Sequence, residues 1–346
     1  MDGGLMAERI TSVMVAEVAG VSQAAVSRVF TPGASVSKKT AEKVRRAANR
    51  LGYRPNSLAR AMVSGKSRII GLVVAYLDNY FYPDAVEKLS NAFQKRGYHV
   101  LVFMASNTAD KIDSVMQEIL DYQVDGIVLA SVALSSEITK RCKENGVPVV
   151  LFNRSQDNPN ISAVTSDNYK GGAEVANLLL KDGHEKIAYL AGWEGASTQR
   201  DREAGFVDAL RKAGKSIVSR SVGNFRTEQT REAALSLFNV PVSKRPDAIF
   251  VANDHMALTT MDVIRFSLNL SIPNDVAIVG FDDVPPASWP AYNLTTVRQR
   301  ANKMVECTVD IILEKIEQSD NGKSIQIKIP SPIVVRGTTR NLEGEI

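Results

Sequence analysis

Gln23 and Arg28 lie near the start of the chain and have side chains that could read the edges of DNA bases. A glutamine amide can form paired hydrogen bonds with adenine, and an arginine guanidinium can do the same with guanine. Ala24 offers only a small apolar contact, for example to a thymine methyl group. These contacts require a helix that exposes all three side chains, so the flanking residues decide whether the chemistry is available.

The flanking residues predict three short helices. Each expected helix follows a residue able to cap it: 12–19 after Thr11, about 23–31 after Ser22, and about 38–51 after Ser37. Gly20 supplies the backbone freedom that a tight turn needs, and the short link AGVS suits two helices packed at a steep angle. Such a helix-turn-helix places its second helix in the major groove. The apolar residues at helical spacing are Met14, Val15, Val18, Val26, Val29, Val44, Ala47, Ala48 and Leu51.

The distribution of charge supports a nucleic-acid partner for this segment. Residues 1–66 contain eleven lysines and arginines and four acidic residues, a net charge of +7. The remaining residues contain 31 basic and 34 acidic side chains, a net charge of −3. A basic head on a nearly neutral body is the electrostatic pattern of a DNA-binding module joined to another domain. A merely solvated helix face remains open on charge alone.

From residue 68 onward, apolar strand-like runs alternate with amphipathic helical stretches. The runs IIGLVVAYL, HVLVFMA, GIVLAS and PVVLFN form one cycle, and KIAYLAG, DAIFVAND and VAIVGFDD form a second. This alternation predicts parallel, doubly wound sheets, and two cycles predict two similar lobes with a cleft between them. Ligands bind at the carboxyl ends of strands in such sheets, so the residues after each strand are candidates for a binding site.

Hydrogen-bonding and aromatic side chains follow these strands, and they suit a polyhydroxylated ligand. The candidates are Asp78, Asn79, Phe81, Tyr82, Asn153, Arg154, Thr198, Arg200, Arg202, Phe225, Asn253, Asp254, Asp282 and Asp283. We assign Asp254 and Asp283 to helix caps or turns instead. Phe81 and Tyr82 could equally be ordinary packing residues at the lip of the cleft.

The chain resembles the LacI/GalR family of repressors. The resemblance is carried by AGVS, VSRV, VS-x-x-T, LGY-x-PN and AR, which occur in order between residues 19 and 60, and it continues to near the C-terminus. It implies that Gln23, Ala24 and Arg28 read bases. It also implies that residues from Asn56 to about Ser64 form a hinge helix that enters the minor groove. Met62 stands where the family usually has a leucine wedge, and methionine is also an acceptable apolar wedge.

The resemblance and the residue chemistry together give two predicted contact sets. The DNA-binding set is Thr11, Ser22, Gln23, Ala24, Ala25, Ser27, Arg28, Ser37, Asn56, Ala59, Arg60 and Met62. The effector-binding set is Phe81, Tyr82, Asn153, Arg202, Phe225, Asn253 and Asp282. In the effector-binding region two positions depart from the family pattern: Tyr80 replaces a common proline, and Asn153 stands where many members have aspartate.

These observations predict an all-α helix-turn-helix head plus an α/β effector domain like the periplasmic binding proteins, with two doubly wound lobes. The expected head spans 1–54, the hinge 55–66, and the effector and dimerisation domain 67–346. We expect one lobe to comprise about 67–164 and 295–324, and the other about 165–294 and 325–340. The expected function is a DNA-binding transcriptional regulator, which the resemblance implies is a repressor, whose operator affinity depends on a small, carbohydrate-like effector.

Other functional classes receive less support. His99, His184 and His255 lie in separate segments, and no catalytic, metal or phosphate-loop motif is present, so we expect no enzyme activity, metal or cofactor. A transport receptor would need a signal peptide, whereas no apolar run of that kind or of membrane-spanning length occurs. Two isolated cysteines fit a reducing cytoplasm. We expect a homodimer because the C-terminus lacks an apolar heptad tail that could join dimers.

Overall fold

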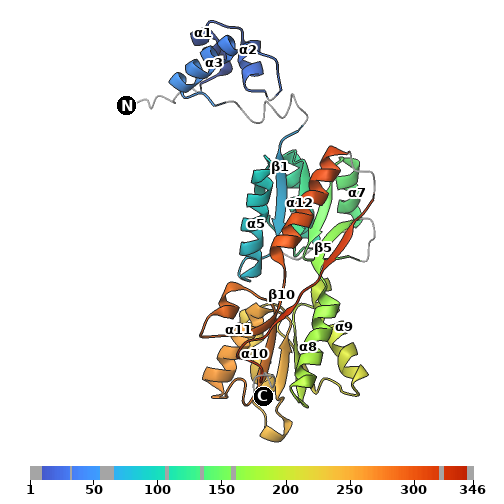
Figure 1. The fold of residues 1–346 in the computed structure, drawn as a ribbon. Coiled ribbons are helices and arrows are strands. Elements are labelled where there is room, and N and C mark those ends of the chain that lie inside the picture. Colours follow the sequence, from blue (N-terminus) through green and yellow to red (C-terminus); the bar gives the residue numbers. More distant parts are fainter. Residues whose placement is uncertain are drawn as a thin grey trace, which may run out of the picture. The chain divides into compact units, whose positions relative to one another are not determined.

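The computed structural model describes residues 10–31, 33–54, 66–105, 109–132, 136–156, 161–318 and 323–340. The chain divides into two units, residues 1–68 and 69–346, close to the boundary predicted from the sequence (Figure 1). Most of the expected hinge lies outside the described residues. The predicted DNA contacts Asn56, Ala59, Arg60 and Met62 therefore have no structural description.

The described residues of the first unit form three helices, as predicted: α1 (Ser12–Ala19), α2 (Gln23–Val29) and α3 (Lys38–Leu51). Each is capped by the expected residue. The hydroxyl oxygens of Thr11, Ser22 and Ser37 accept hydrogen bonds from backbone amides three residues further on. Each cap satisfies one of the amide groups that the first helical turn leaves without a helical partner. Helix α2 ends two residues earlier than expected.

A small apolar core holds these helices together. Val15, Val26 and Val44 are fully buried, and the alanines of α1 and α3 pack around them. Val18 lies at helical spacing from Met14 and Val15, but it is 50% exposed. Helix α1 packs through Val15 and the small residues Ala16 and Ala19, and this turns Val18 toward solvent.

The second unit contains two six-stranded sheets, each with helices on both faces (Figure 1). The first sheet has the order β11-β5-β4-β3-β1-β2, and its strand pairs are all parallel. Its strands are β1 (Ile69–Val74), β2 (His99–Met104), β3 (Gly126–Ala130), β4 (Val149–Phe152), β5 (Ser162–Ser166) and β11 (Gln326–Ile329). Its helices are α5 (Phe81–Lys95), α6 (Ala109–Asp121), α7 (Ser136–Glu144) and α12 (Ala301–Glu317).

Alternate residues of β1 contribute to the two cores of this lobe. Ile70, Leu72 and Val74 pack with residues of α5 and α12, whereas Val73 packs with residues of α6 on the opposite face. Because successive strand residues point to opposite faces, a run of consecutive apolar residues is what a sheet covered on both sides requires.

The second sheet has the order β12-β10-β9-β8-β6-β7, with only the β10–β12 pair antiparallel. Its strands are β6 (Ile187–Ala191), β7 (Ser219–Val222), β8 (Ala248–Val251), β9 (Ala277–Asp282), β10 (Thr295–Arg298) and β12 (Ile333–Val334). Its helices are α8 (Asn168–Lys181), α9 (Ser197–Lys212), α10 (Thr227–Phe238) and α11 (Asp254–Asp262), which continues into a π-helical turn at Val263–Ser267. Two 3₁₀ turns occupy Val242–Lys244 and Pro285–Ser288.

The chain passes between the lobes three times, and this corrects two expected boundaries. Strand β10 pairs with β9 in the second lobe, although residues 295–298 were assigned to the first. Strand β11 pairs with β5 in the first lobe, although residues 325–329 were assigned to the second. The connections therefore lie between β5 and α8, between β10 and α12, and between β11 and β12, the last drawn in red in Figure 1.

Glycines allow α8 and α9 to pack with their backbones in contact. An added Cβ at Gly172 would lie 2.0 Å from the carbonyl oxygen of Arg202, and one at Gly205 would lie 1.9 Å from that of Tyr169. No other residue fits at either position without moving a helix. This close packing fixes the position of Arg202 relative to the start of α8.

Candidate functional site

The predicted base-reading residues lie on the open side of α2. Gln23, Ala24, Ser27 and Arg28 are exposed, and Ala25 is half-buried. The Gln23 amide donates a hydrogen bond to the Ser12 hydroxyl at 3.0 Å, and Arg28 Nε donates to the Ala24 carbonyl at 3.3 Å. These contacts restrain both side chains while leaving them on the surface, which is what a helix entering the major groove requires.

The seven predicted effector-binding residues all lie in the second unit, and each is between 1% and 7% exposed. Four of them follow or end strands: Asn153 after β4, Phe225 after β7, Asn253 after β8 and Asp282 at the end of β9. The other three are on helices, Phe81 and Tyr82 in the first turn of α5 and Arg202 on α9. The carboxyl ends of both sheets thus supply the side chains, as the strand-end argument predicted.

Arg202 is held by contacts from three segments of its lobe. Its Nε donates to Asn168 Oδ1 at 2.9 Å, Nη1 donates to the Ala252 carbonyl at 2.6 Å, and Nη2 lies 3.4 Å from Asp282 Oδ1. The guanidinium carbon also lies 3.6 Å from the centre of the Phe281 ring, in cation–π geometry. Every guanidinium nitrogen is therefore paired, and the group is rigid.

Asp282 is a buried carboxylate that connects the lobes. Gln299, in the second connection between the lobes, donates to Asp282 Oδ1 at 2.6 Å and accepts from the Ser166 hydroxyl at 2.8 Å. Burial raises the pKa of Asp282 to about 6, and the Arg202 guanidinium opposes that rise. Ser166 ends β5, so this chain of hydrogen bonds runs from one sheet to the other.

Arg154 makes the most direct contact across the cleft. Its Nη1 donates to the Thr198 hydroxyl at 2.5 Å, and the neighbouring Ser155 amide donates to the Ser197 hydroxyl at 3.0 Å. Arg154 and Ser155 follow β4 in the first lobe, whereas Ser197 and Thr198 begin α9 in the second. These bonds hold the lobes against each other at the predicted site.

Aromatic rings cover one side of the site. Phe81 lies against Tyr82 edge to face and stacks with Phe152, and Tyr76 meets Tyr82 edge to face. Phe225 lies apart from them against Gly192, where an added Cβ would lie 2.0 Å from the Phe225 ring. Aromatic faces of this kind can cover the C–H patches of a sugar ring.

Two predicted residues serve local structure as well. The Asn253 side chain caps α11 by accepting from the Met256 amide at 3.0 Å. Asp254 accepts from the Val284 amide and the Thr296 hydroxyl, and burial raises its pKa to about 7. Asp254 therefore braces the loop after β9, in agreement with the structural role assigned to it from the sequence.

Several site residues have strained backbones. Asn153, Phe225 and Asp282 have φ values of 55°, 59° and 133°, in a region that side-chain-bearing residues rarely adopt. Such strain clusters at functional sites because the surrounding structure must hold it in place. Three of the seven predicted residues share this property.

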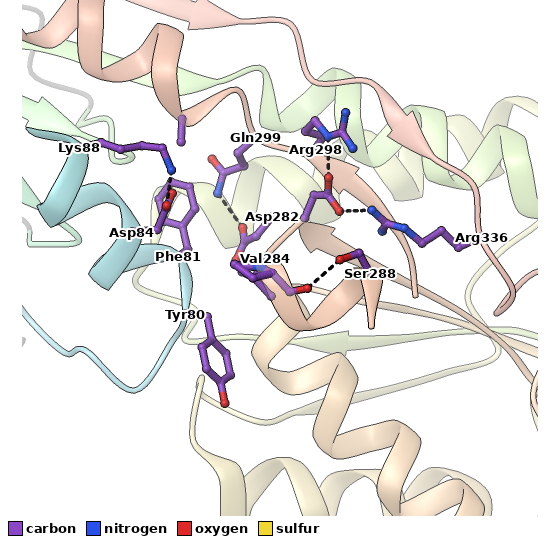
Figure 2. A pocket seen from close by; sticks show the side chains of 13 residues that line it. Tyr80, Phe81, Asp84, Lys88, Asp282, Val284, Ser288, Arg298, Gln299 and Arg336 are labelled. Atoms are coloured by element: carbon purple, nitrogen blue, oxygen red, sulfur yellow. Dashed lines mark hydrogen bonds and ion pairs between the residues drawn. The ribbon is translucent and has the colours of Figure 1, made fainter. Parts of the chain in front are cut away.

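A cavity of about 270 Å³ opens beside the connections between the lobes (Figure 2). It includes Phe81 and Asp282 of the predicted set, and the other five do not line it. Figure 2 shows Gln299 bonded to Asp282, with Arg298 and Arg336 nearby, and both arginines form ion pairs with Asp283. The predicted set thus extends from this opening into the closed contact between the lobes.

Sequence reasoning placed too little weight on some residues of the site and too much on others. Gln299, Asn168 and Tyr76 were not candidates, because they neither follow an expected strand nor carry charge. Arg154 was a candidate but was left out of the predicted contact set. Arg200, another candidate, is exposed on α9 and away from the buried contacts.

No histidine belongs to the predicted contact set, although His255 adjoins Asp254 at the start of α11. His184 is buried, with Nδ1 3.5 Å from Asp247 Oδ1, and burial lowers its pKa. Within the described ranges, no group of three or more metal-ligating side chains could hold an ion. No helix in the described part of the chain is long and apolar enough to span a membrane.

Comparisons with known proteins agree with both units. Residues 67–335 match the family described as periplasmic binding proteins and sugar binding domain of LacI family, and residues 14–56 match bacterial regulatory proteins, lacI family. The sucrose operon repressor of Streptococcus mutans is 32% identical over 89% of this chain and 93% of its own. The HTH-type transcriptional repressor PurR of Vibrio campbellii is 27% identical over 95% of this chain and 98% of its own.

A solved structure of the lac repressor dimer, bound to operator and the anti-inducer ONPF, has the same fold. It matches with a TM-score of 0.86 and 27% identity over 96% of this chain and 99% of that one. The named relatives are repressors and not enzymes. The chain belongs to the LacI family of bacterial regulatory proteins, and it joins a helix-turn-helix head to an effector domain like the periplasmic binding proteins.

Proposed function

We propose that this repressor binds a pseudo-palindromic operator as a homodimer and that a carbohydrate-like effector bound between the lobes controls its affinity for DNA. The observation that carries the proposal is the combination of two features in one chain. An exposed Gln23–Arg28 surface lies on a basic head, and a buried Arg202–Asp282 pair lies where two sheets meet. The first feature suits base recognition, and the second suits a small ligand rich in hydroxyl groups.

In this mechanism one α2 helix enters each half-site, and the segment around Met62 from each protomer meets at the operator centre. Effector binding changes the contacts between the lobes, such as that between Arg154 and Thr198. An effector shifts the equilibrium only by its difference in affinity for the two states. An inducer must therefore favour the form that does not bind DNA, and a corepressor must favour the form that does. The dimer is supported by the likeness to the operator-bound lac repressor dimer.

The carbohydrate-like effector is supported by the site itself and by the relatives. Aromatic faces, a paired guanidinium and a carboxylate are the groups that bind hydroxyl-rich rings. The matching family is described by its sugar binding domain, and one relative is a sucrose operon repressor. We place this activity in the cytoplasm, where operator DNA is accessible.

Nuclease footprinting of the DNA around the protein's own gene and its neighbours tests the proposal. The expected result is a protected two-fold symmetric site whose half-saturation shifts when the effector is added. The Arg28→Ala variant should weaken that protection, and light scattering should report a dimer. Absence of any protected site, or an operator affinity that no small molecule changes, would refute the mechanism.

A further inference from the structure

The proposed effector site contains two buried arginines, and one of them has no ion-pair partner among the described residues. Arg154 and Arg202 are 4% and 3% exposed, so both guanidinium groups are buried. Asp282 is the carboxylate that forms an ion pair with Arg202, and the charge of Arg154 also lowers the pKa of Asp282. Asp254 also lies near Asp282, and its two oxygens accept hydrogen bonds from the Val284 amide and the Thr296 hydroxyl, not from Arg154. Within the described residues, no carboxylate forms an ion pair with Arg154.

Arg154 also has hydrogen-bonding capacity that the described residues leave unused. Its Nη1 donates to the Asn153 carbonyl and to the Thr198 hydroxyl, which orients the guanidinium across the cleft. Its Nη2 is buried and has no acceptor in the described part of the chain. Burying a charged donor without an acceptor costs free energy, so a group that binds there recovers it.

The adjacent residue offers the complementary group. Asn153 Oδ1 is also buried and has no donor among the described residues, while Nδ2 lies 3.4 Å from the Tyr82 hydroxyl. The amide of Asn153 carries no charge, so it does not offset the charge of Arg154, and it presents an acceptor for a neutral hydroxyl.

We infer that the effector is a hydroxylated carboxylate, of the aldonate or uronate class, whose carboxylate accepts from Arg154 Nη2 and whose neighbouring hydroxyl donates to Asn153 Oδ1. This inference rests on the proposed function of the site and specifies its ligand. A neutral sugar would leave Arg154 without a counter-charge. A phosphate ester has three acceptor oxygens and close to two negative charges, more than one free guanidinium nitrogen satisfies.

Calorimetric titration of the full-length protein tests the class of ligand. The probes are gluconate, galactonate, glucuronate and galacturonate, each compared with its neutral counterpart: glucitol, galactitol, glucose and galactose. Glucose 6-phosphate is a further probe, which tests whether the site prefers a phosphate ester. We expect at least one acid to bind about 10- to 100-fold more tightly than its counterpart, as loss of one charge-assisted hydrogen bond predicts. Binding of none of the acids, equal binding of a counterpart, or tighter binding of the phosphate overturns the inference.

Two variants test the residues. Asn153→Asp changes one atom and places a carboxylate beside Arg154, and Asp tolerates the left-handed backbone at this position. It should weaken acid binding about 10- to 100-fold while leaving the neutral counterpart unaffected or bound more tightly. Arg154→Gln should lose the acid preference as well. Arg200→Gln removes an exposed guanidinium from α9 and serves as the control that keeps acid binding.

Footprinting of the same preparations separates this inference from the proposed function. A neutral sugar that binds and shifts operator affinity, with no acid doing so, overturns the acid class and leaves the repressor mechanism intact. Failure to protect any DNA refutes the repressor mechanism whatever ligand binds. Acid binding that Asn153→Asp does not weaken, in a variant with unchanged thermal unfolding, overturns the assignment to Arg154.

Discussion

Replacing Arg202 with methionine should strongly destabilise the effector domain, because the arginine satisfies three buried groups. The variant removes donors from Asn168 Oδ1, the Ala252 carbonyl and Asp282. Methionine has a similar length and can still pack against the Phe281 ring, so the change is mainly electrostatic. Asp282 keeps its hydrogen bond from Gln299, but its ion pair is lost.

The expected magnitude follows from the burial of the pair. Both side chains are 3% exposed, so solvent does not screen the interaction. Removing one partner of such a pair costs about 3–5 kcal/mol, because the other charge is left buried and uncompensated. Asp282 can relieve part of this cost by taking up a proton.

Protonation makes the loss depend on pH. Burial raises the pKa of Asp282 in the folded state to about 6, above the unfolded value of about 3.9. A group whose folded pKa is raised by burial costs stability as pH rises from the unfolded value through the folded one. Without Arg202 the pKa of Asp282 in the folded state rises further. The stability that the variant loses therefore continues to increase above pH 6. The loss of stability at pH 8 should exceed that at pH 5 by about 1.4 kcal/mol or more, which is the free energy that corresponds to a pKa shift of one unit.

Urea unfolding followed by tryptophan fluorescence measures this loss in the intact protein. The two tryptophans, Trp193 and Trp289, both lie in the effector domain, so the signal reports on that unit. Arg200→Met is the control, because an exposed arginine on the same helix should change stability by less than about 0.5 kcal/mol. A loss below about 1 kcal/mol at pH 8, or the same loss at both pH values, would refute the reasoning.

Three further predictions concern the reading helix, its cap and the helix contact behind the site. Arg28→Ala should cost about 1–3 kcal/mol of operator affinity at a single base position in a set of operator variants, and equal loss on every sequence would make Arg28 a phosphate contact. Ser22→Ala removes the acceptor for the Ala25 amide and should destabilise the head by about 0.5–2 kcal/mol, measured by helical circular dichroism during melting. An unchanged stability of the head in this variant would mean that water replaces the Ser22 hydroxyl as the acceptor. Gly172→Ala should cost at least about 1–3 kcal/mol in urea unfolding, because its Cβ would meet a backbone carbonyl at 2.0 Å, and wild-type stability would disprove the tight α8–α9 contact.

Local signals in the sequence were enough to predict much of the fold. The caps at Thr11, Ser22 and Ser37 depend only on residues within one helical turn, and all three were confirmed. The strands before Asn153 and Asp282 were also predicted correctly, because consecutive apolar residues are required by sheets covered on both faces.

Features that depend on distant segments could not be predicted in the same way. Gln326 aligns with Ala163 in the first sheet, and no local pattern shows that a strand near residue 326 belongs to that lobe. Arg154 is buried because Thr198, from the other lobe, lies against it. Asn253 could be expected either to cap α11 or to face a ligand, since both roles use the same amide. The roles of the predicted contact residues in binding remain predictions.

The threefold passage of the chain between the lobes has a consequence for its synthesis. A ribosome completes the head within the first sixth of the chain, whereas the first lobe stays open at one edge until β11 has been made. Before residue 301 is reached, the nascent sheet lacks both α12, which covers one of its faces, and the strand that pairs with β5. A message cut short before residue 301 would therefore yield a complete reading head attached to a sensor with exposed apolar surface, a product suited to proteolysis rather than to regulation.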